Sequence, residues 1–344
     1  MRAFVVPVYA PAVRVLVVTN VYPSPDRPFS GTFVHDQVES LHALGLELDV
    51  LHVRRHAAGA GIYRGLGGRV RDQARDTGAD VVHVMYGGVM AESVTRAVDE
   101  IPVVVSFCGT DLLGGRAGSL ATRVRERVGV LASRRAARRA DAVIVKSSAL
   151  RAALPAGLAD DRVWLIPNGV DTDRFAPAPR EAARSALDWP PDERIVLFPA
   201  APNRPEKRFE LARDAVAELE RTTPGVRLHM LEGVAHRDVP TWLNAVDAVV
   251  LTSLHEGSPN VVKEALACCT PVVSVDVGDV RERIDGVPGC AVAAADPVSL
   301  ASALGAALRA ERDCAGRARI EELSHPRVAA QIAGIYAGIV SSAR

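Results

Sequence analysis

Short aliphatic runs alternate along the whole chain with stretches in which apolar residues recur every three or four positions. Within the runs the apolar residues are continuous, which is typical of parallel strands that are buried on both faces. The stretches between the runs have the period of amphipathic helices. We therefore predict an α/β protein with strands at residues 13–18, 48–53, 81–85, 103–107, 142–145, 163–166, 195–198, 226–231, 248–251 and 272–275.

The rhythm breaks once, between Asn168 and Pro191, where an Asn-Gly-Val-Asp segment is followed by several prolines. Such a segment is typical of a hinge, and 344 residues at about 150 per domain also predict two domains. We expect two doubly wound, Rossmann-like domains, residues 1–168 and 169–325, and a terminal helix within 326–344 that packs back across the hinge. Ligands of open parallel sheets bind beyond the carboxyl ends of the strands, so the expected site is a cleft between the domains.

The overall charge is balanced, with 41 basic and 41 acidic residues. A chain with no net charge lacks a general field that would collect phosphate backbones, which argues against a nucleic-acid partner. The cysteines are odd in number and have no C-x-x-C spacing, so we expect reduced thiols in a cytoplasmic protein and no zinc site. These cysteines are Cys108, Cys268, Cys269, Cys290 and Cys314.

The first apolar run, residues 3–18, could be read as a secretory leader. It is interrupted by Pro7, Pro11 and Arg14 and leads directly into a loop, which favours a first strand over a leader. No stretch of the chain reaches the roughly 20 apolar residues that a membrane-spanning helix needs.

The stretch with the most chemical information follows the third strand of the second half. Ser258 is a favourable N-cap and Pro259 a favourable first helical residue, so we predict that a helix begins there. The amino end of such a helix attracts a phosphate or diphosphate. Glu256 lies in the preceding loop and Glu264 in the second turn, and carboxylates are suited to accepting hydrogen bonds from sugar or ribose hydroxyls.

The two glutamates and their neighbours resemble the E-x7-E signature of retaining glycosyltransferase family 4, which has the GT-B fold. The sequence from Thr252 to Arg283 most closely resembles the bacterial teichuronic-acid type of these enzymes. The resemblance implies that Glu256 binds the transferred sugar and Glu264 the donor ribose, and that no metal or other cofactor takes part. The expected donor-binding residues are Gly31, Gly257, Ser258, Pro259, Asn260, Val261 and Glu264.

A basic motif follows the first strand of the second half. Arg204 and Lys207 can reach the same cleft there and neutralise a diphosphate leaving group. The family usually has Gly-Arg, four residues and Lys-Gly, whereas this chain has Ala-Pro in place of Gly-Arg and Arg208 in place of the last glycine. The resemblance assigns Lys207, and we infer from local geometry that Arg204 is the displaced arginine. With Glu256, these are the predicted catalytic residues.

The first half supplies the acceptor side. Gly31 precedes a predicted helix at 33–44 and lets the backbone approach a ligand closely; the resemblance places it at the donor phosphate or the reaction centre. Where many relatives have His-Gly-Thr/Ser-Asp, this chain has Cys108-Gly-Thr-Asp111, and Tyr86 follows a methionine instead of the frequent histidine. The usual cleft histidine is therefore missing, and Tyr86, Cys108 and Asp111 are the acceptor-side candidates. Cys108 is either a small buried thiol or a covalent nucleophile whose base the sequence does not supply.

The stretch from Arg123 to Arg139 is a basic helical segment. Such a segment is commonly a solvated face, and the alternative is a peripheral contact with anionic lipid or a phosphorylated acceptor.

Taken with the resemblance, these motifs predict a bacterial, metal-independent hexosyltransferase that acts with retention. It would move a sugar from a nucleotide diphosphate sugar to a small-molecule, lipid-linked or glycan acceptor. The expected location is the cytoplasm, with association at a membrane as the alternative. Two other functions stay open: a pseudo-glycosyltransferase that couples a cyclitol, and a catalytically silent subunit that binds nucleotide sugar.

Overall fold

The computed structural model describes residues 13–27, 30–54, 60–115 and 119–343. These residues form two compact units. The first comprises the described residues up to Gly169 and those from His325 on, and the second comprises Val170–Ser324. The two segments at which the chain changes unit are joined by a parallel bridge between Val170 and Ser324 and a 2.9 Å hydrogen bond from Val170 N to Leu323 O.

The first unit contains a six-stranded, wholly parallel sheet with the order β2-β1-β3-β4-β5-β6. Because β1 lies between β2 and β3, the strand order reverses at β1 and β3. The strands are β1 (Arg14–Thr19), β2 (Glu47–His52), β3 (Val81–Met85), β4 (Val103–Phe107), β5 (Ala142–Val145) and β6 (Val163–Leu165).

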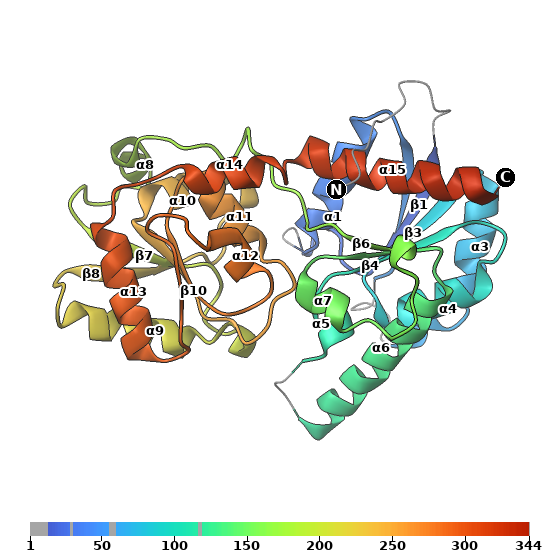
Figure 1. Ribbon diagram of the computed structural model, residues 1–344, viewed down its shortest axis with the longest axis horizontal. Helices are drawn as coiled ribbons and strands as arrows, with labels where there is room; N and C mark the ends of the chain where they lie inside the picture. Colours follow the sequence, from blue (N-terminus) through green and yellow to red (C-terminus); the bar gives the residue numbers. More distant parts are fainter. Residues whose placement is uncertain (1–12, 28–29, 55–59, 116–118, 344) are drawn as a thin grey trace. The chain divides into compact units, whose positions relative to one another are not determined.

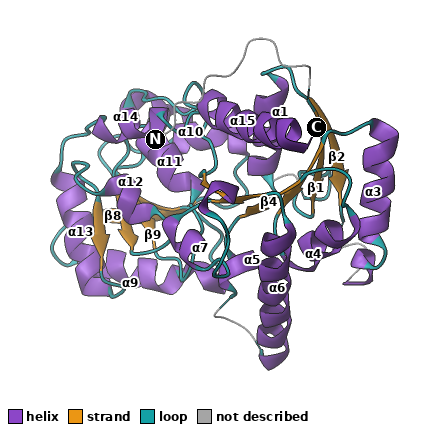
Figure 2. Cartoon of the chain, turned by 45° about the vertical axis from the view of Figure 1, so that its right-hand side comes forward, coloured by secondary structure: helices purple, strands orange, loops and turns teal. Residues whose placement is uncertain are grey.

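Helices cover both faces of this sheet, as the continuous apolar strands predict (Figure 2). Residues of α3, α4, α6 and α7 share one apolar core with the sheet, and residues of α1 and α15 share the other. The helices are α1 (Thr32–His42), η1 (Ala60–Tyr63), α3 (Leu66–Thr77), α4 (Gly88–Ala97), α5 (Thr110–Leu113), α6 (Leu120–Arg139), α7 (Ser148–Ala152), η2 (Asp160–Arg162) and α15 (His325–Ala343).

The second unit contains a five-stranded parallel sheet with the order β11-β10-β9-β7-β8, so the strand order reverses between β7 and β9. Its strands are β7 (Arg194–Phe198), β8 (Val226–Met230), β9 (Ala248–Leu251), β10 (Val272–Val275) and β11 (Ala291–Ala293). Figure 1 shows α9 and α13 on one face of this sheet and α10, α11 and α14 on the other. The helices are α8 (Arg180–Ala186), η3 (Pro205–Lys207), α9 (Phe209–Glu220), η4 (His236–Asp238), α10 (Val239–Ala245), α11 (Asn260–Ala267), α12 (Val280–Ile284), α13 (Pro297–Arg309) and α14 (Ala315–Glu321).

Each strand predicted from the apolar runs is present, with bounds that shift by at most a residue or two. The strand β11 was not predicted, because three residues are too short to give a pattern. Residues 3–12 of the first apolar run lie outside the described residues, and the strand predicted at its end is present as β1.

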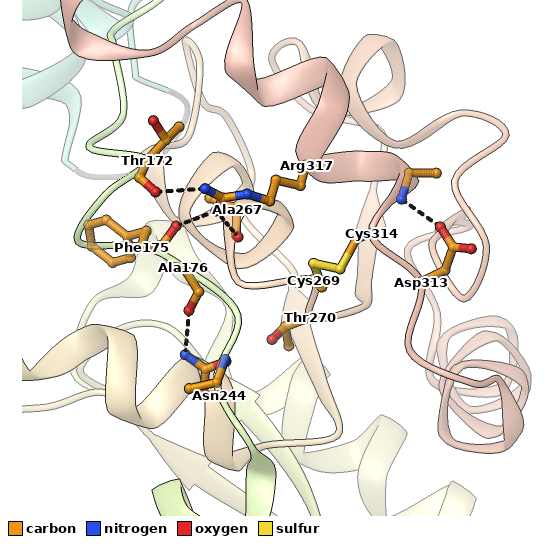
Figure 3. The surroundings of a disulfide bond; sticks show 12 residues. Thr172, Phe175, Ala176, Asn244, Ala267, Cys269, Thr270, Asp313, Cys314 and Arg317 are labelled. Atoms are coloured by element: carbon orange, nitrogen blue, oxygen red, sulfur yellow. Dashed lines mark hydrogen bonds between the residues drawn. A yellow bond between two sulfur atoms is a disulfide. The ribbon is translucent and has the colours of Figure 1, made fainter.

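The expectation of reduced thiols throughout is wrong, because Cys269 and Cys314 form a disulfide (Figure 3). Cys269 follows α11 and Cys314 precedes α14, and the fold brings their Cα atoms to 4.8 Å across a sequence separation of 45. Cysteine spacing along the chain gives no sign of this approach. Since disulfides persist in oxidising surroundings, the cysteines no longer support the expected cytoplasmic location.

Candidate active site

The predicted catalytic residues of the second unit lie where its strand order reverses. The loop after β7 carries Arg204 and Lys207, and the loop after β9 carries Glu256. The carboxyl ends of two strands that diverge in this way form the usual ligand crevice of an open α/β sheet. The sequence pattern therefore brings these loops to one place within a single unit.

Lys207 and Glu256 form an ion pair between Nζ and Oε1. Their side chains are 18% and 16% exposed, so both charges are largely withdrawn from water. A pair in such surroundings interacts more strongly than one at the surface. The structure thus joins the predicted leaving-group lysine directly to the predicted sugar-binding carboxylate.

The backbone of the two loops is held together beside this pair. Leu254 N donates to Glu206 O at 2.8 Å, and Thr252 Oγ1 donates to Lys207 O at 2.7 Å. Arg208 closes the junction from the other side, because its Nε donates to Thr252 O at 2.5 Å. These bonds fix the separation of the two loops and therefore the position of Lys207 relative to Glu256.

Arg208 lies where the family usually has glycine, and its backbone conformation explains the family's preference for glycine. Its φ of 52° lies in the left-handed region, which is unfavourable for any residue except glycine. The guanidinium bonds to the carbonyls of Thr252 and Ser253 offset that cost. Burial lowers the pKa of the Arg208 guanidinium, in agreement with its enclosed position.

Arg204 does not join the Lys207–Glu256 pair. Its side chain is 53% exposed, and its guanidinium binds Glu206 Oε1 at 2.7 Å. The neighbouring Glu206 therefore holds the predicted second phosphate-binding cation near solvent.

Glu264 lies in the second turn of α11, as predicted, and its carboxylate has a partner that the sequence did not indicate. His236 Nε2 lies 3.0 Å from Glu264 Oε1. His236 belongs to η4, which follows β8, and its ring packs against Phe175 with the centroids 5.6 Å apart. His236 was not among the predicted site residues, although its place in the loop after β8, the strand next to β7, was a signal for this position.

The start of α11 differs from the prediction. The helix begins at Asn260, Pro259 precedes it in an extended conformation, and no side chain caps it. Ser258 is buried and donates its hydroxyl to Asp279 Oδ2 at 2.8 Å, so the predicted N-cap role is wrong. A buried carboxylate outcompetes the local capping bond for this hydroxyl.

Gly278 makes room for the loop that carries Glu256. Its φ is 59°, and a Cβ there would lie 2.8 Å from Gly257 O and 3.2 Å from Glu256 Cβ. Gly278 and Asp279 contact one continuous segment through Gly257 and Ser258. That segment carries the donor-binding candidates Gly257, Ser258, Pro259, Asn260 and Val261.

In the first unit, Gly31 lies directly before α1 with a φ of 70°. A Cβ at this position would meet Val21 O at 2.3 Å, so only glycine fits. Gly31 thus makes the expected close approach to the backbone of Val21, in the loop after β1. That contact accounts for the glycine whether or not a ligand binds beside it.

Asp111 connects the loops after β3 and β4. Its buried carboxylate accepts hydrogen bonds from the backbone N–H groups of Gly87 at 2.8 Å, Gly109 at 2.7 Å and Cys108 at 3.1 Å. Burial raises the pKa of Asp111, and these hydrogen bonds oppose that rise. Through these three N–H groups, Asp111 holds the loops after β3 and β4 together.

Tyr86 lies in the same loop as Gly87. It has a φ of 98°, which is unfavourable for a side chain of its size, and its hydroxyl lies 2.7 Å from Thr110 Oγ1. An unusual backbone conformation of this kind is often found beside a ligand site.

Cys108 is half-buried, and burial raises the pKa of its thiol to about 12. A thiol of that pKa is protonated near neutral pH and is a poor nucleophile, which favours the buried-thiol interpretation.

Lys146, near Cys108, is a buried cation that the sequence analysis did not identify. Lys146 follows β5, is 0% exposed, and its amine has no hydrogen-bond partner among the described residues. Burial lowers the pKa of Lys146.

His83 lies in β3, three residues before Tyr86, and its side chain is fully buried. Its Nδ1 lies 2.5 Å from Tyr336 Oη of α15, and its Nε2 lies 2.8 Å from Ser106 Oγ. Burial lowers the pKa of His83 to about 3. Its role is therefore to hold α15 on the sheet.

The described ranges contain no cluster of three or more His, Cys, Asp or Glu residues that could hold a metal ion. In the same ranges, no helix is both long and apolar enough to cross a membrane.

Comparisons with known proteins agree with this architecture. Residues 30–174 match the family described as Glycosyltransferase Family 4, and residues 193–310 match the family described as Glycosyl transferases group 1. A D-inositol 3-phosphate glycosyltransferase of Mycobacterium bovis (strain BCG / Pasteur 1173P2) is 32% identical over 201 residues, which are 49% of this chain and 40% of that protein. The chain therefore matches well under half the length of this curated relative.

Two solved structures share the fold over almost the whole chain. Sucrose-phosphate synthase from Thermosynechococcus elongatus has a TM-score of 0.76 at 16% identity, covering 96% of this chain and 100% of the other. HepE from Anabaena, in complex with UDP, has a TM-score of 0.66 at 16% identity, covering 95% and 100%. These similarities show that the chain has the GT-B fold. The family matches in both units show that it belongs to the group 1, family 4 glycosyltransferases.

Proposed function

We propose that the protein is a metal-independent glycosyltransferase that moves a sugar from a nucleoside diphosphate sugar to an acceptor hydroxyl with retention of the anomeric configuration. The observation that carries this proposal is the pairing of Lys207 with Glu256 at the point where the strand order of the second unit reverses, with Glu264 one helix turn beyond. A cation and two carboxylates at this place suit a donor that has both a diphosphate and vicinal hydroxyls.

In the proposed reaction the acceptor oxygen bonds to the anomeric carbon on the face from which the nucleoside diphosphate leaves. The leaving diphosphate takes the electron pair of the broken carbon–oxygen bond, and one of its oxygens takes the proton of the acceptor hydroxyl. Lys207 stabilises the negative charge that develops on the diphosphate, which is the step where a positioned cation has its largest effect. Glu256 orients the transferred sugar, and Glu264 binds the ribose.

The support for a uridine donor is indirect. HepE, which shares the fold, was solved with UDP, so UDP-sugars are the first donors to test. The curated relative acts on D-inositol 3-phosphate by its name, so this compound is the first acceptor to test. Lipid-linked and glycan acceptors complete the screen.

The test is transfer measured by mass spectrometry, with the product anomer assigned by NMR. We expect a retained anomer, activity that survives a chelator, and a loss of about a hundredfold or more in kcat/KM for Glu264→Ala. The matched control is Glu210→Ala, which removes a glutamate that is 68% exposed on α9 and should keep full activity. An inverted product would contradict retention, and a fully active Glu264→Ala variant would contradict the site.

The two alternatives give different results in the same experiment. A silent donor-binding subunit would be stabilised by UDP in a thermal-shift assay, by about 2.7 kcal/mol at 100 times the dissociation constant, and would neither transfer nor release nucleotide. A pseudo-glycosyltransferase would consume the donor only with an amino-cyclitol acceptor, and the product mass would show the new linkage.

A further inference from the structure

The helix α6 exposes an apolar stripe that none of the described residues of its unit covers. Val124, Val128 and Leu131 are 52%, 52% and 51% exposed. Their spacing of four and three residues places them on one face of the helix. Leu113 at the end of α5 is also exposed, at 40%, and lines a hollow of about 620 Å³ together with Leu131 and Val130.

The position of α6 explains why this stripe is bare. Among the α6 residues whose side chains are described, the buried ones all lie in its second half: Ala132, Ser133, Ala136 and Ala137. Figures 1 and 2 both show the first half of α6 extending beyond the other helices of its unit. Val124 and Val128 therefore lie on the free half of the helix, and Leu131 lies at the start of the half that is anchored.

Arginines flank the stripe. Arg123, Arg127 and Arg134 line the same hollow, and none of the three forms an ion pair with another described residue. Glu126, the one acidic residue of α6, lines the same hollow, so three arginines face one carboxylate there. The exposed face of α6 is thus apolar with a net positive charge.

We propose that this face docks on an anionic lipid bilayer. Guanidinium groups bind the phosphates of lipid headgroups, and the apolar stripe enters the boundary between headgroups and acyl chains, which is how basic amphipathic helices lie on membranes. The stripe extends about 10 Å along the helix, from Val124 to Leu131. A bilayer meets both requirements along that length, whereas a single soluble phosphate would cover the arginines and leave the valines exposed.

A second copy of the chain is a less suitable partner. Two α6 faces brought together would place like-charged arginines within a Debye length of each other, which is about 8 Å at physiological salt. The proposal goes beyond sugar transfer and does not depend on it.

The experiment is co-sedimentation of the full chain with vesicles. One set contains only phosphatidylcholine, and the other contains equimolar phosphatidylcholine and phosphatidylglycerol. We expect binding to the anionic vesicles alone, and weaker binding as salt is raised. For Arg127→Glu/Arg134→Glu we expect affinity to fall at least about twentyfold, and for Val124→Ser/Val128→Ser/Leu131→Ser about tenfold or more.

The matched control is Val298→Ser, because Val298 is 64% exposed on α13 and should contribute nothing to lipid binding. All of the substituted side chains are exposed, so thermal melts should coincide with that of the native chain. Equal binding to neutral vesicles, or unchanged binding of both α6 variants, would overturn the proposal. Light scattering that shows a dimer broken by the serine variant would overturn it too, in favour of contact between copies.

Discussion

The two units present polar residues at the same place in similar sheets, yet they use them differently. At the carboxyl ends of β7 and β9, charged side chains pair with each other and remain partly exposed, as Lys207 does with Glu256. At the carboxyl ends of β3 and β4, the polar side chain of Asp111 is buried and bound to backbone N–H groups. Similar loops in the first unit thus maintain structure, whereas those in the second unit are suited to bind a charged ligand.

Substitution of Lys207 should give the largest effect. Lys207→Ala removes the cation that stabilises the leaving diphosphate, so we expect kcat to fall about 10²- to 10³-fold. Arg204→Ala should cost less than about tenfold, because Arg204 is half exposed and bound to Glu206. Steady-state kinetics with a saturating donor measure both, and equal losses in the two variants would contradict the different roles.

Asp111 should show the opposite behaviour. Asp111→Asn keeps the shape of the side chain but replaces the carboxylate, which accepts hydrogen bonds from the N–H groups of Gly87, Cys108 and Gly109, with a neutral amide. We expect the free energy of unfolding to drop by about 2–3 kcal/mol, while the affinity for UDP stays the same. Urea unfolding and nucleotide titration test the two halves of this prediction, and a stable variant with lost nucleotide affinity would reverse it.

The pH dependence of stability should reflect His83. Its ordinary pKa is 6.5 and its pKa in the folded protein is about 3, because it is buried. Between these values the unfolded chain binds a proton that the folded chain does not, so stability is full above about pH 6.5 and falls as the pH decreases, by up to about 1.4 kcal/mol per pH unit.

The check is urea unfolding at several pH values between about 4 and about 7, where the slope should appear below about pH 6.5. His83→Gln should flatten the slope, and substitution of the exposed His42 by Gln should leave it as in the native protein. An unchanged slope in the His83 variant would show that other groups cause the acid sensitivity.

Cys108 should give the smallest effect. Since burial raises the pKa of its thiol to about 12, the thiolate is nearly absent at neutral pH. Cys108→Ser should therefore keep kcat within about twofold. A loss of a hundredfold, or a covalent sugar adduct detected by mass spectrometry on Cys108, would restore the nucleophile hypothesis.

These contrasts also explain what the sequence could predict. The strands followed from continuous apolar runs, and the meeting of Lys207 with Glu256 followed from their positions after parallel strands. The partner of Glu264 did not follow, because His236 belongs to none of the motifs that the sequence analysis identified and only the tertiary fold brings it near. Ser258 was assigned wrongly for a related reason: local capping preference is weak, and the buried Asp279 is a stronger acceptor.

The bond between Cys269 and Cys314 changes the topology of the second unit. It closes a ring across a sequence separation of 45, and that ring contains β10, α12, β11 and α13. A protease that cuts the chain once inside the ring leaves every residue covalently attached, so the cut protein separates into two fragments only after reduction. Within this ring, therefore, one broken peptide bond is not enough to separate α11, which carries Glu264, from the chain that follows it.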